Sequence, residues 1–407
     1  MEIQVISFYK YALLEAPEGP GACAIARELE DQARERGLTG RLLVAPEGIN
    51  GSLAGKAGAV AGFIRHLVSH ESLAMKEADF KHSLADGGEP FPDLVIKEVD
   101  ELIASGGKLT AVPIAATGQG YVTPAEFRQR LLERDESTVV LDVRNRREAA
   151  IGHFDGAVVP PTRTFAEYPQ WLESQREELC GKKVLMYCTG GVRCEKVSAW
   201  LRLHTEAASV EHLEGGIHRY LEAFGTDGVW KGKNFVFDRR QSVDGEGRSD
   251  AMQTLAPELT VGRCETCAVP HDRFHPGALC AVCREPVLVC PTCLQASLDV
   301  HCEDHRDVSS CYFSDLDRFA EDQLQGQRSA LLALMECLSS GKQCVTDPTH
   351  RQIASTRLAK FCDVLTISCF RWPQAQESTA DPEATGRQDR SDSPGTALEG
   401  RGQRRTH

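Results

Sequence analysis

The sequence predicts an α/β protein in which a small α+β domain precedes a domain built on a parallel sheet, a cysteine-rich zinc module and a helical C-terminal extension. Three observations predict this order. Strand and helix patterns alternate in one way over residues 1–112 and in another over 120–240, cysteines are concentrated in 260–311, and large aliphatic residues nearly vanish after 373. A chain of 407 residues is long enough for two or three domains, each with its own core.

The first domain, residues 1–112, begins with the strand pattern IQVISFY and continues with the helix pattern GACAIARELEDQARERG, which a glycine ends. The segment RLLVAPEGINGSLAG predicts a strand and a hairpin around Asn50-Gly51, a pair that favours tight turns. A helix is expected through AGAVAGFIRHLVSH. Strand, helix, strand, hairpin and helix in this order are typical of a ferredoxin-like α+β sandwich.

The second domain, residues 120–240, alternates helices with short apolar strands. The helix TPAEFRQRLLER has Thr123 as its N-cap and Pro124 at its first position. STVVLDVR and KKVLMYCTGG are buried strands, GVRCEKVSAWLRLH is the helix after the second, and VEHLEGG is a further strand before the helix IHRYLEAF. This alternation predicts a parallel sheet with helices on both faces.

Charge and the N-terminus restrict the class of protein. A net charge of −13 argues against a wholly basic nucleic-acid coat, although residues 182–240 carry more Lys and Arg than Asp and Glu. The N-terminus has no basic start, long apolar core or small-residue cleavage site, and no stretch approaches roughly 18 apolar residues. We therefore expect a cytoplasmic protein without a membrane segment, whose 16 cysteines are metal ligands, catalytic thiols or core residues rather than disulfides.

The segment MYCTGGVRCEK, residues 186–196, is the main candidate for an active site. Cys188 ends a buried strand, at the edge where open α/β sheets form their sites, and a helix begins a few residues later. Glycines let the loop direct N–H groups at the sulfur, and the helix N-terminus and Arg193 add positive potential, so the pKa of the thiol is expected to fall. The alternative is an inert buried cysteine beside a glycine turn. The loop between Cys188 and Arg193 consists of Thr189, Gly190, Gly191 and Val192.

The spacing of this loop resembles that of rhodaneses, which have four residues between cysteine and arginine where tyrosine phosphatases have five. The segment DVRNRREAAIGHFDGA, residues 142–157, also resembles a rhodanese segment. The resemblance implies that four of its residues fix the architecture around the site, with a catalytic role as the alternative for the histidine. These residues are Asp142, Arg144, Glu148 and His153.

A longer series of motifs resembles the tRNA uridine hydroxylase family. The motifs are FYKYALL, GRLLVAPEGINGSLAG, LDVRNRREAAIGHFDGA, FAEYPQWLE, GKKVLMYCTGGVRCEK, HLEGGIHRYLE and NFVFDRR, in that order. The resemblance covers about residues 5–311 and implies a rhodanese-like domain behind an acylphosphatase-like domain. It also implies oxygen-dependent 5-hydroxylation of the wobble uridine of tRNA, with Cys188 as the essential cysteine and the tRNA anticodon region as partner. Cys194 matches the motif too, but its helix position favours packing over catalysis.

Two other functions are compatible with the same residues. A rhodanese-type sulfurtransferase would carry a persulfide on Cys188, and a non-enzymatic adaptor would bind zinc and tRNA through a vestigial loop. The intact Cys188 and Arg193 argue against the adaptor. A persulfide, a peroxide or a thiohemiacetal on Cys188 would each use the same loop.

Basic and aromatic residues alternate near the end of the second domain, a pattern that suits contact with an exposed anticodon loop. A solvated surface strand is the alternative interpretation. The residues are Lys231, Lys233, Arg239 and Arg240, interleaved with Trp230, Phe235 and Phe237.

The cysteine-rich module, residues 260–311, has the spacing of zinc ligands. Three CxxC pairs are followed by one further cysteine and a histidine, which is enough for about two tetrahedral structural sites. The pairs can alternate between sites, first with third and second with fourth, but other pairings and the substitutes His271, His275, His301 and Cys311 remain open. No nucleotide cofactor is evident. A helical extension is expected over 312–372 and a disordered tail over 373–407. The candidate ligands are Cys264, Cys267, Cys280, Cys283, Cys290, Cys293, Cys302 and His305.

Overall fold

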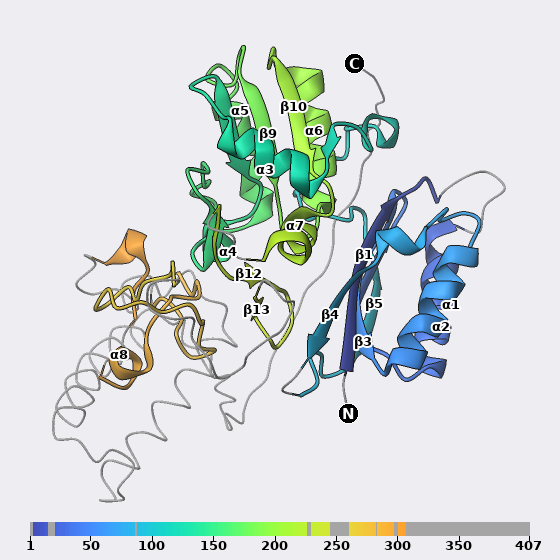
Figure 1. The fold of residues 1–407 in the computed structure, drawn as a ribbon. Helices are drawn as coiled ribbons and strands as arrows, with labels where there is room; N and C mark the ends of the chain where they lie inside the picture. Colours follow the sequence, from blue (N-terminus) through green and yellow to red (C-terminus); the bar gives the residue numbers. More distant parts are fainter. Residues whose placement is uncertain are drawn as a thin grey trace, which may run out of the picture. The chain divides into compact units, whose positions relative to one another are not determined.

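The computed structural model describes residues 3–14, 21–85, 88–225, 229–244, 260–281, 283–296 and 300–306. The expected helical extension and disordered tail lie outside these residues. The predicted α/β fold class is confirmed, with a sheet of ferredoxin-like strand order followed by a parallel sheet (Figure 1).

The N-terminal sheet has the strand order β4-β1-β3-β2-β5. β1 pairs antiparallel with β3 and with β4, and β2 pairs antiparallel with β3. β5 forms a parallel edge beside β2. Two helices, α1 and α2, cover one face of this sheet (Figure 1). Helix α1 buries Ala22, Ile25, Leu29 and Ala33, whose spacing of three and four residues places them on one helical face. The elements are β1 Ile3–Tyr11, α1 Gly21–Glu35, β2 Thr39–Ala45, β3 Gly48–Gly55, α2 Ala57–Ser69, the 3₁₀ turn Glu77–Asp79, β4 Lys81–Ala85 and β5 Leu94–Glu98.

The predicted turn at Asn50-Gly51 is wrong. Ala45 pairs with Gly48, so the hairpin turns at residues 46–47, and Asn50-Gly51 lies inside β3. The Asn50 amide donates a hydrogen bond to the Leu102 carbonyl at 3.2 Å. A Cβ on Gly51 would lie 2.8 Å from Leu42 Cδ1, so this glycine is explained by close packing rather than by a turn.

The sheet of the second domain has the strand order β6-β10-β9-β7, and all its pairings are parallel. Helix α3 begins as predicted: the Thr123 hydroxyl accepts from the Glu126 N–H, and Pro124 is the first helical residue. The elements are β6 Tyr121–Val122, α3 Pro124–Leu132, β7 Thr138–Asp142, α4 Arg146–Ala149, β8 Gly152–Phe154, α5 Tyr168–Ser174, β9 Lys183–Tyr187, α6 Val192–His204, β10 Ser209–Leu213 and α7 Gly216–Phe224, with 3₁₀ turns at Ile114–Ala116 and Phe165–Glu167.

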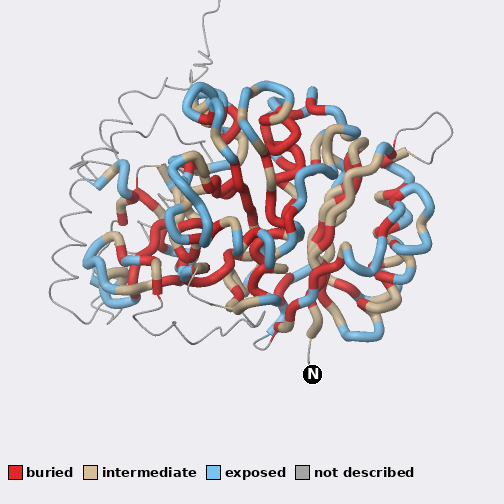
Figure 2. Tube along the Cα trace, turned by 45° about the horizontal axis from the view of Figure 1, so that its top comes forward, coloured by how far each residue is buried: buried red, intermediate tan, exposed pale blue. Residues whose placement is uncertain are grey.

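Alternate side chains of the central strand β9 enter two different cores. Val184 and Met186 pack in a cluster with residues of α5 and α6, whereas Leu185 and Tyr187 pack in a cluster with residues of α3 and α7. The buried strands at the centre of this domain are visible in Figure 2. Both faces of the sheet are therefore covered, which holds the carboxyl end of β9, and Cys188 with it, in a rigid frame.

Short elements follow the parallel sheet. Strand β11 (Trp230–Gly232) pairs with β8, and β12 (Asn234–Phe235) pairs with β13 (Ser242–Val243). The cysteine-rich module contains the short helix α8 (Pro291–Ala296) and a 3₁₀ turn at Glu303–His305. Within the described part of the chain, no helix has the length and apolar character needed to cross a bilayer.

Candidate active site

Cys188 directly follows β9, and α6 begins four residues later. The Gly191 N–H donates a hydrogen bond to the Cys188 sulfur at 3.1 Å. Gly191 has φ +102°, which side chains rarely adopt, so the loop needs glycine here. Gly216 is equally constrained: a Cβ there would lie 2.5 Å from the Cys188 carbonyl oxygen. The loop thus has the curled form that its glycines predicted.

The surroundings of Cys188 favour the thiolate. The residue is fully buried, and burial on its own raises the pKa of the thiol. A hydrogen bond from the Cys194 thiol, the charge of Arg193 and the N–H groups of both residues outweigh burial, so the pKa of Cys188 lies well below its ordinary value. Cys194 is buried in the same core, and its own pKa is raised by burial and by Cys188. A buried, charged sulfur is a chemically activated group rather than an inert core thiol.

Arg193 is held by a carboxylate that the fold buries completely. Its Nη1 and Nη2 atoms each lie 2.7 Å from an oxygen of Glu148, and Nη2 also donates to Thr189 Oγ1 at 3.2 Å. Burial raises the pKa of Glu148, but Arg193 and Arg144 outweigh it and hold this pKa below its ordinary value. The pair therefore fixes the arginine beside the loop as a charged fork.

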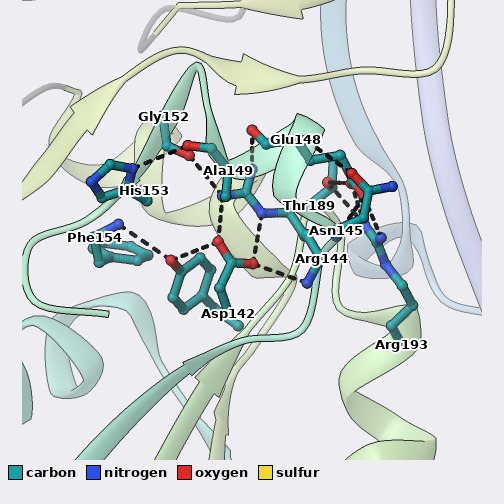
Figure 3. A network of polar contacts seen from close by, with 11 residues as sticks. Asp142, Arg144, Asn145, Glu148, Ala149, Gly152, His153, Phe154, Thr189 and Arg193 are labelled. Atoms are coloured by element: carbon teal, nitrogen blue, oxygen red, sulfur yellow. Dashed lines mark hydrogen bonds and ion pairs between the residues drawn. The ribbon is translucent and has the colours of Figure 1, made fainter. Parts of the chain in front are cut away.

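A second buried pair lies beside the first and is drawn in Figure 3. Arg144 donates to both carboxylate oxygens of Asp142, at 2.9 and 2.7 Å, and to the Gly152 carbonyl at 2.7 Å. Tyr187 donates to Asp142 at 2.8 Å, which ties β9 to β7 immediately before Cys188. His153 lies at the far side of this network, with Nδ1 3.0 Å from the Ala149 carbonyl oxygen (Figure 3).

The eight candidate metal ligands gather into two groups of four. In each group the sulfur and nitrogen atoms lie within 4.8 Å of one another, a spacing that a tetrahedral ion can bridge. The grouping follows the alternating pattern, first pair with third pair and second pair with the last cysteine and histidine. The groups are Cys264, Cys267, Cys290 and Cys293, and Cys280, Cys283, Cys302 and His305.

Ion pairs attach the cysteine-rich module to the parallel-sheet domain. Arg146, the first residue of α4, pairs with Glu285 and with Asp304, the latter at 2.7 Å. Lys233 pairs with the buried Asp272 at 3.1 Å. The module is thus joined to the helix that also carries Glu148.

Comparisons with known families agree with this architecture. Residues 3–102 match the UPF0176 acylphosphatase-like domain, 123–223 the rhodanese-like domain and 231–307 the rhodanase C-terminal region. The tRNA uridine(34) hydroxylase of Enterococcus faecalis is 40% identical over 245 residues, which is 60% of this chain and 74% of the relative. The chain belongs to the tRNA uridine(34) hydroxylase family.

Two further matches cover different parts of the chain. The tRNA uridine(34) hydroxylase of Brucella canis is 38% identical over 252 residues, 61% of this chain and 78% of the relative. A rhodanese-like domain protein from Staphylococcus aureus, known as a crystal structure, is 27% identical, covers 25% of this chain and 91% of its own, and has a TM-score of 0.20.

The basic and aromatic stretch near residue 235 is neither a row of aromatic residues open to RNA nor a simple solvated surface strand. Lys231 pairs with Asp155 at 2.7 Å, and Arg240 pairs with Asp238 at 2.7 Å. Trp230 and Phe235 are buried, so they do not offer faces to RNA bases. Phe237 is 61% exposed and lies 5.8 Å from the Arg193 guanidinium, which places this one ring beside the site.

Sequence reasoning missed the contribution of the N-terminal domain. The Tyr9 hydroxyl donates to Glu195 at 3.0 Å, and the Tyr11 hydroxyl donates to the Val192 carbonyl at 3.3 Å. Lys196 of the same helix pairs with Glu47 at 2.7 Å. Tyr9 and Tyr11 are two residues apart in β1 and so share one face of the strand, a signal that was present in the motif FYKYALL. In this family member, the helix that follows the cysteine loop is therefore fixed by both domains.

Proposed function

We propose that this protein catalyses oxygen-dependent 5-hydroxylation of the wobble uridine of tRNA, with Cys188 as the essential catalytic residue. Membership of the tRNA uridine(34) hydroxylase family supports the reaction and the substrate. The observation that carries the role of Cys188 is a fully buried sulfur that accepts a hydrogen bond from the Gly191 N–H at 3.1 Å and lies beside Cys194 and Arg193, which favour its thiolate form. A family of enzymes acting on tRNA also supports a cytoplasmic location.

The surrounding residues take positioning roles in this proposal. The Arg193 side chain and the N–H groups of Gly191, Arg193 and Cys194 stabilise negative charge on the sulfur or on a group attached to it. Glu148 orients Arg193, because the two-point ion pair leaves the guanidinium one geometry. Asp142 and Arg144 fix the end of β9 through Tyr187. His153 has a structural role, since its ring bonds the α4 backbone.

We also propose that the cysteine-rich module holds about two structural zinc ions. Sets of four thiolates, or of three thiolates and an imidazole, are the donors that zinc prefers, and both groups have such a composition. Four protein ligands leave no position for water or substrate, so the metal would stabilise the module and take no part in the reaction.

Nucleoside mass spectrometry of tRNA tests the reaction. A strain lacking this protein should lose 5-hydroxyuridine-derived nucleosides, and the wild-type gene should restore them. Cys188→Ser should not restore them, whereas Cys180→Ser, a change at an exposed cysteine, should. Wild-type nucleoside levels with Cys188→Ser would contradict the proposal. Sulfur transfer from thiosulfate to cyanide by a protein that leaves tRNA unchanged would instead favour a sulfurtransferase.

A further inference from the structure

A cavity of about 660 Å³ lies beside the cysteine loop and has walls from both domains. β1 and β4 of the N-terminal domain provide Tyr9, Tyr11 and Lys81, and the second domain provides Tyr121, Glu195 and Arg219. The volume is within the range of roughly 300–1,000 Å³ that is typical of small-molecule sites.

Lys81 is the unusual residue in this wall. It is 5% exposed, and among the described residues no hydrogen bond or ion pair reaches its ammonium group. The ammonium lies over the ring of Tyr9, whose centroid is 4.8 Å from Nζ. Burial, aided by Arg219, lowers the pKa of Lys81 to about 8. A largely buried ammonium group that lines a cavity and has no protein acceptor is suited to donate to a ligand that brings the acceptor.

The other cations of the wall already have partners. Arg219 donates to the carbonyl oxygens of Ala78 and Phe80, at 3.0 and 2.7 Å, and to Glu222 at 2.6 Å. Lys10 lies 3.8 Å from Asp79. Glu195 and Glu214 also line the cavity, so it is not the concentrated positive surface that a phosphate backbone would need. Lys81 is therefore a single directed donor.

Tyrosine rings and a buried carboxylate complete the walls. Tyr121 is 41% exposed and its ring lies 4.6 Å from that of His212, which supports it from behind. The Tyr9 and Tyr121 hydroxyls both donate to Glu195, which also accepts from the Gly118 N–H at 2.8 Å. Glu195 thus fixes the two rings, and fixed aromatic faces are what unstacked RNA bases stack on.

The cavity adjoins the proposed catalytic loop. The Tyr9 hydroxyl lies 2.8 Å from the position that a Cβ on Gly191 would take, and Gly215, another lining residue, precedes the glycine packed on the Cys188 carbonyl. A planar ring held against Tyr9 would therefore lie next to the residues that surround the sulfur.

We propose that this cavity binds the uracil ring of the target nucleotide, turned out of the anticodon loop, with Lys81 donating a hydrogen bond to uracil O4. The inference rests on the proposed function, and it assigns recognition of the base to the N-terminal domain. O4 is the atom that distinguishes uracil from cytosine, which has an amino donor at that position, so an ammonium donor selects uracil.

The test compares binding of two anticodon stem-loop RNAs that differ only in U34 or C34. The wild-type protein should bind the U34 RNA more tightly by on the order of tenfold. Lys81→Gln should bring the two affinities close together, because an amide can donate or accept. Lys97→Gln, a change at an exposed position of β5, should keep the preference. Equal loss for both RNAs with Lys81→Gln would show a phosphate contact and overturn the proposal, as would an unchanged preference.

Photocrosslinking of the wild-type protein provides a test that needs no variant. A stem-loop with 5-iodouridine at position 34 should attach to the peptide of Tyr9 and Tyr11 or to that of Tyr121. Attachment confined to residues 230–240 or 260–306, or no attachment, would overturn the cavity assignment. These readouts separate the two proposals. Crosslinking in the cavity without hydroxylation of tRNA would refute the enzyme activity alone, and hydroxylation with crosslinks elsewhere would refute the cavity alone.

Discussion

Arg193 and Glu148 form a two-point ion pair in which both N–O distances are 2.7 Å and the carboxylate is fully buried. The pair joins the helix after the cysteine loop to the short helix α4. Its geometry sets where the arginine charge lies relative to the Cys188 sulfur, and the same carboxylate receives a hydrogen bond from Thr189. The same ion pair therefore contributes to the stability of the site and to the position of a charge that favours the thiolate.

Replacing Glu148 with Gln should destabilise the protein by about 3–5 kcal/mol, because it leaves a buried guanidinium without a counter-charge. Urea unfolding followed by circular dichroism measures the change. The matched control is Glu173→Gln, which breaks an exposed pair with Arg176 at 3.2 Å and should cost less than about 1 kcal/mol. If the two variants unfold at the same urea concentration, the Arg193–Glu148 pair contributes no more to the free energy of unfolding than an exposed ion pair.

Cys188 should differ from the exposed cysteines in how its alkylation depends on pH. Because the pKa of Cys188 is lowered, its thiolate fraction should fall less between pH 8 and pH 6 than that of a thiol with an ordinary pKa of about 8.5, which falls roughly tenfold per unit. Mass spectrometry after timed iodoacetamide treatment measures each rate, with Cys180 as internal reference. The absolute rate at Cys188 should be modest because the residue is fully buried. A rate at Cys188 that rises with pH like that at Cys180 would contradict the thiolate assignment.

Lys81 should make the protein less stable than it would be with an apolar residue. Its pKa of about 8 in the folded state lies below an unfolded value of about 10.4, so the charged form destabilises the native state below pH 8. Lys81→Met should therefore raise the melting temperature at pH 7. The wild-type protein should recover stability relative to the variant between about pH 8 and pH 10.4, as its native state loses the proton first. Melting curves of both proteins across this range test the sign, and a variant that melts lower than the wild type at pH 7 would contradict it.

The fold was predictable wherever local patterns agree with tertiary packing. The parallel sheet, the Thr123 cap and the cysteine loop all follow from short segments whose periodicity and glycines have one consistent interpretation. The turn was misplaced because Asn50-Gly51 has the composition of a turn but is required by contacts of β3 with Leu102 and Leu42, which a sequence does not display.

The candidate site was predictable only for residues that lie in one motif. Cys188 and Arg193 are close in sequence, so their proximity follows from the loop. Tyr9 contacts Glu195, although the two residues are 186 positions apart in the sequence. Lys81, in strand β4, lines the cavity beside the cysteine loop together with both of them. Such contacts depend on how two domains pack, and no local periodicity encodes that packing. The grouping of the eight candidate ligands was among the pairings that the sequence suggested, because three CxxC pairs and one Cys–His pair can share two ions in few ways. The sequence alone did not decide between these pairings.

The cysteine-rich module should lose its structure when metal is removed. Its core cluster is made partly of the candidate ligands themselves, Cys264, Cys280, Cys290 and Cys302, with few aliphatic side chains around them. So small a core cannot offset an ordering cost of about 1–2 kcal/mol per residue, whereas structural zinc contributes on the order of 10 kcal/mol or more. Chelation should therefore open residues 260–306 to protease while the parallel-sheet domain remains resistant.

Metal analysis of purified variants tests the same assignment ligand by ligand. The wild-type protein should contain about two zinc ions per chain, and Cys290→Ser should retain about one, because the serine removes a thiolate from only the first group. Cys180→Ser, which changes a cysteine outside both groups, should retain the full content. Loss of both ions from Cys290→Ser would show that the two groups fold as one unit. A metal-free wild-type protein whose module still resists protease would show that the cysteines stabilise it without zinc.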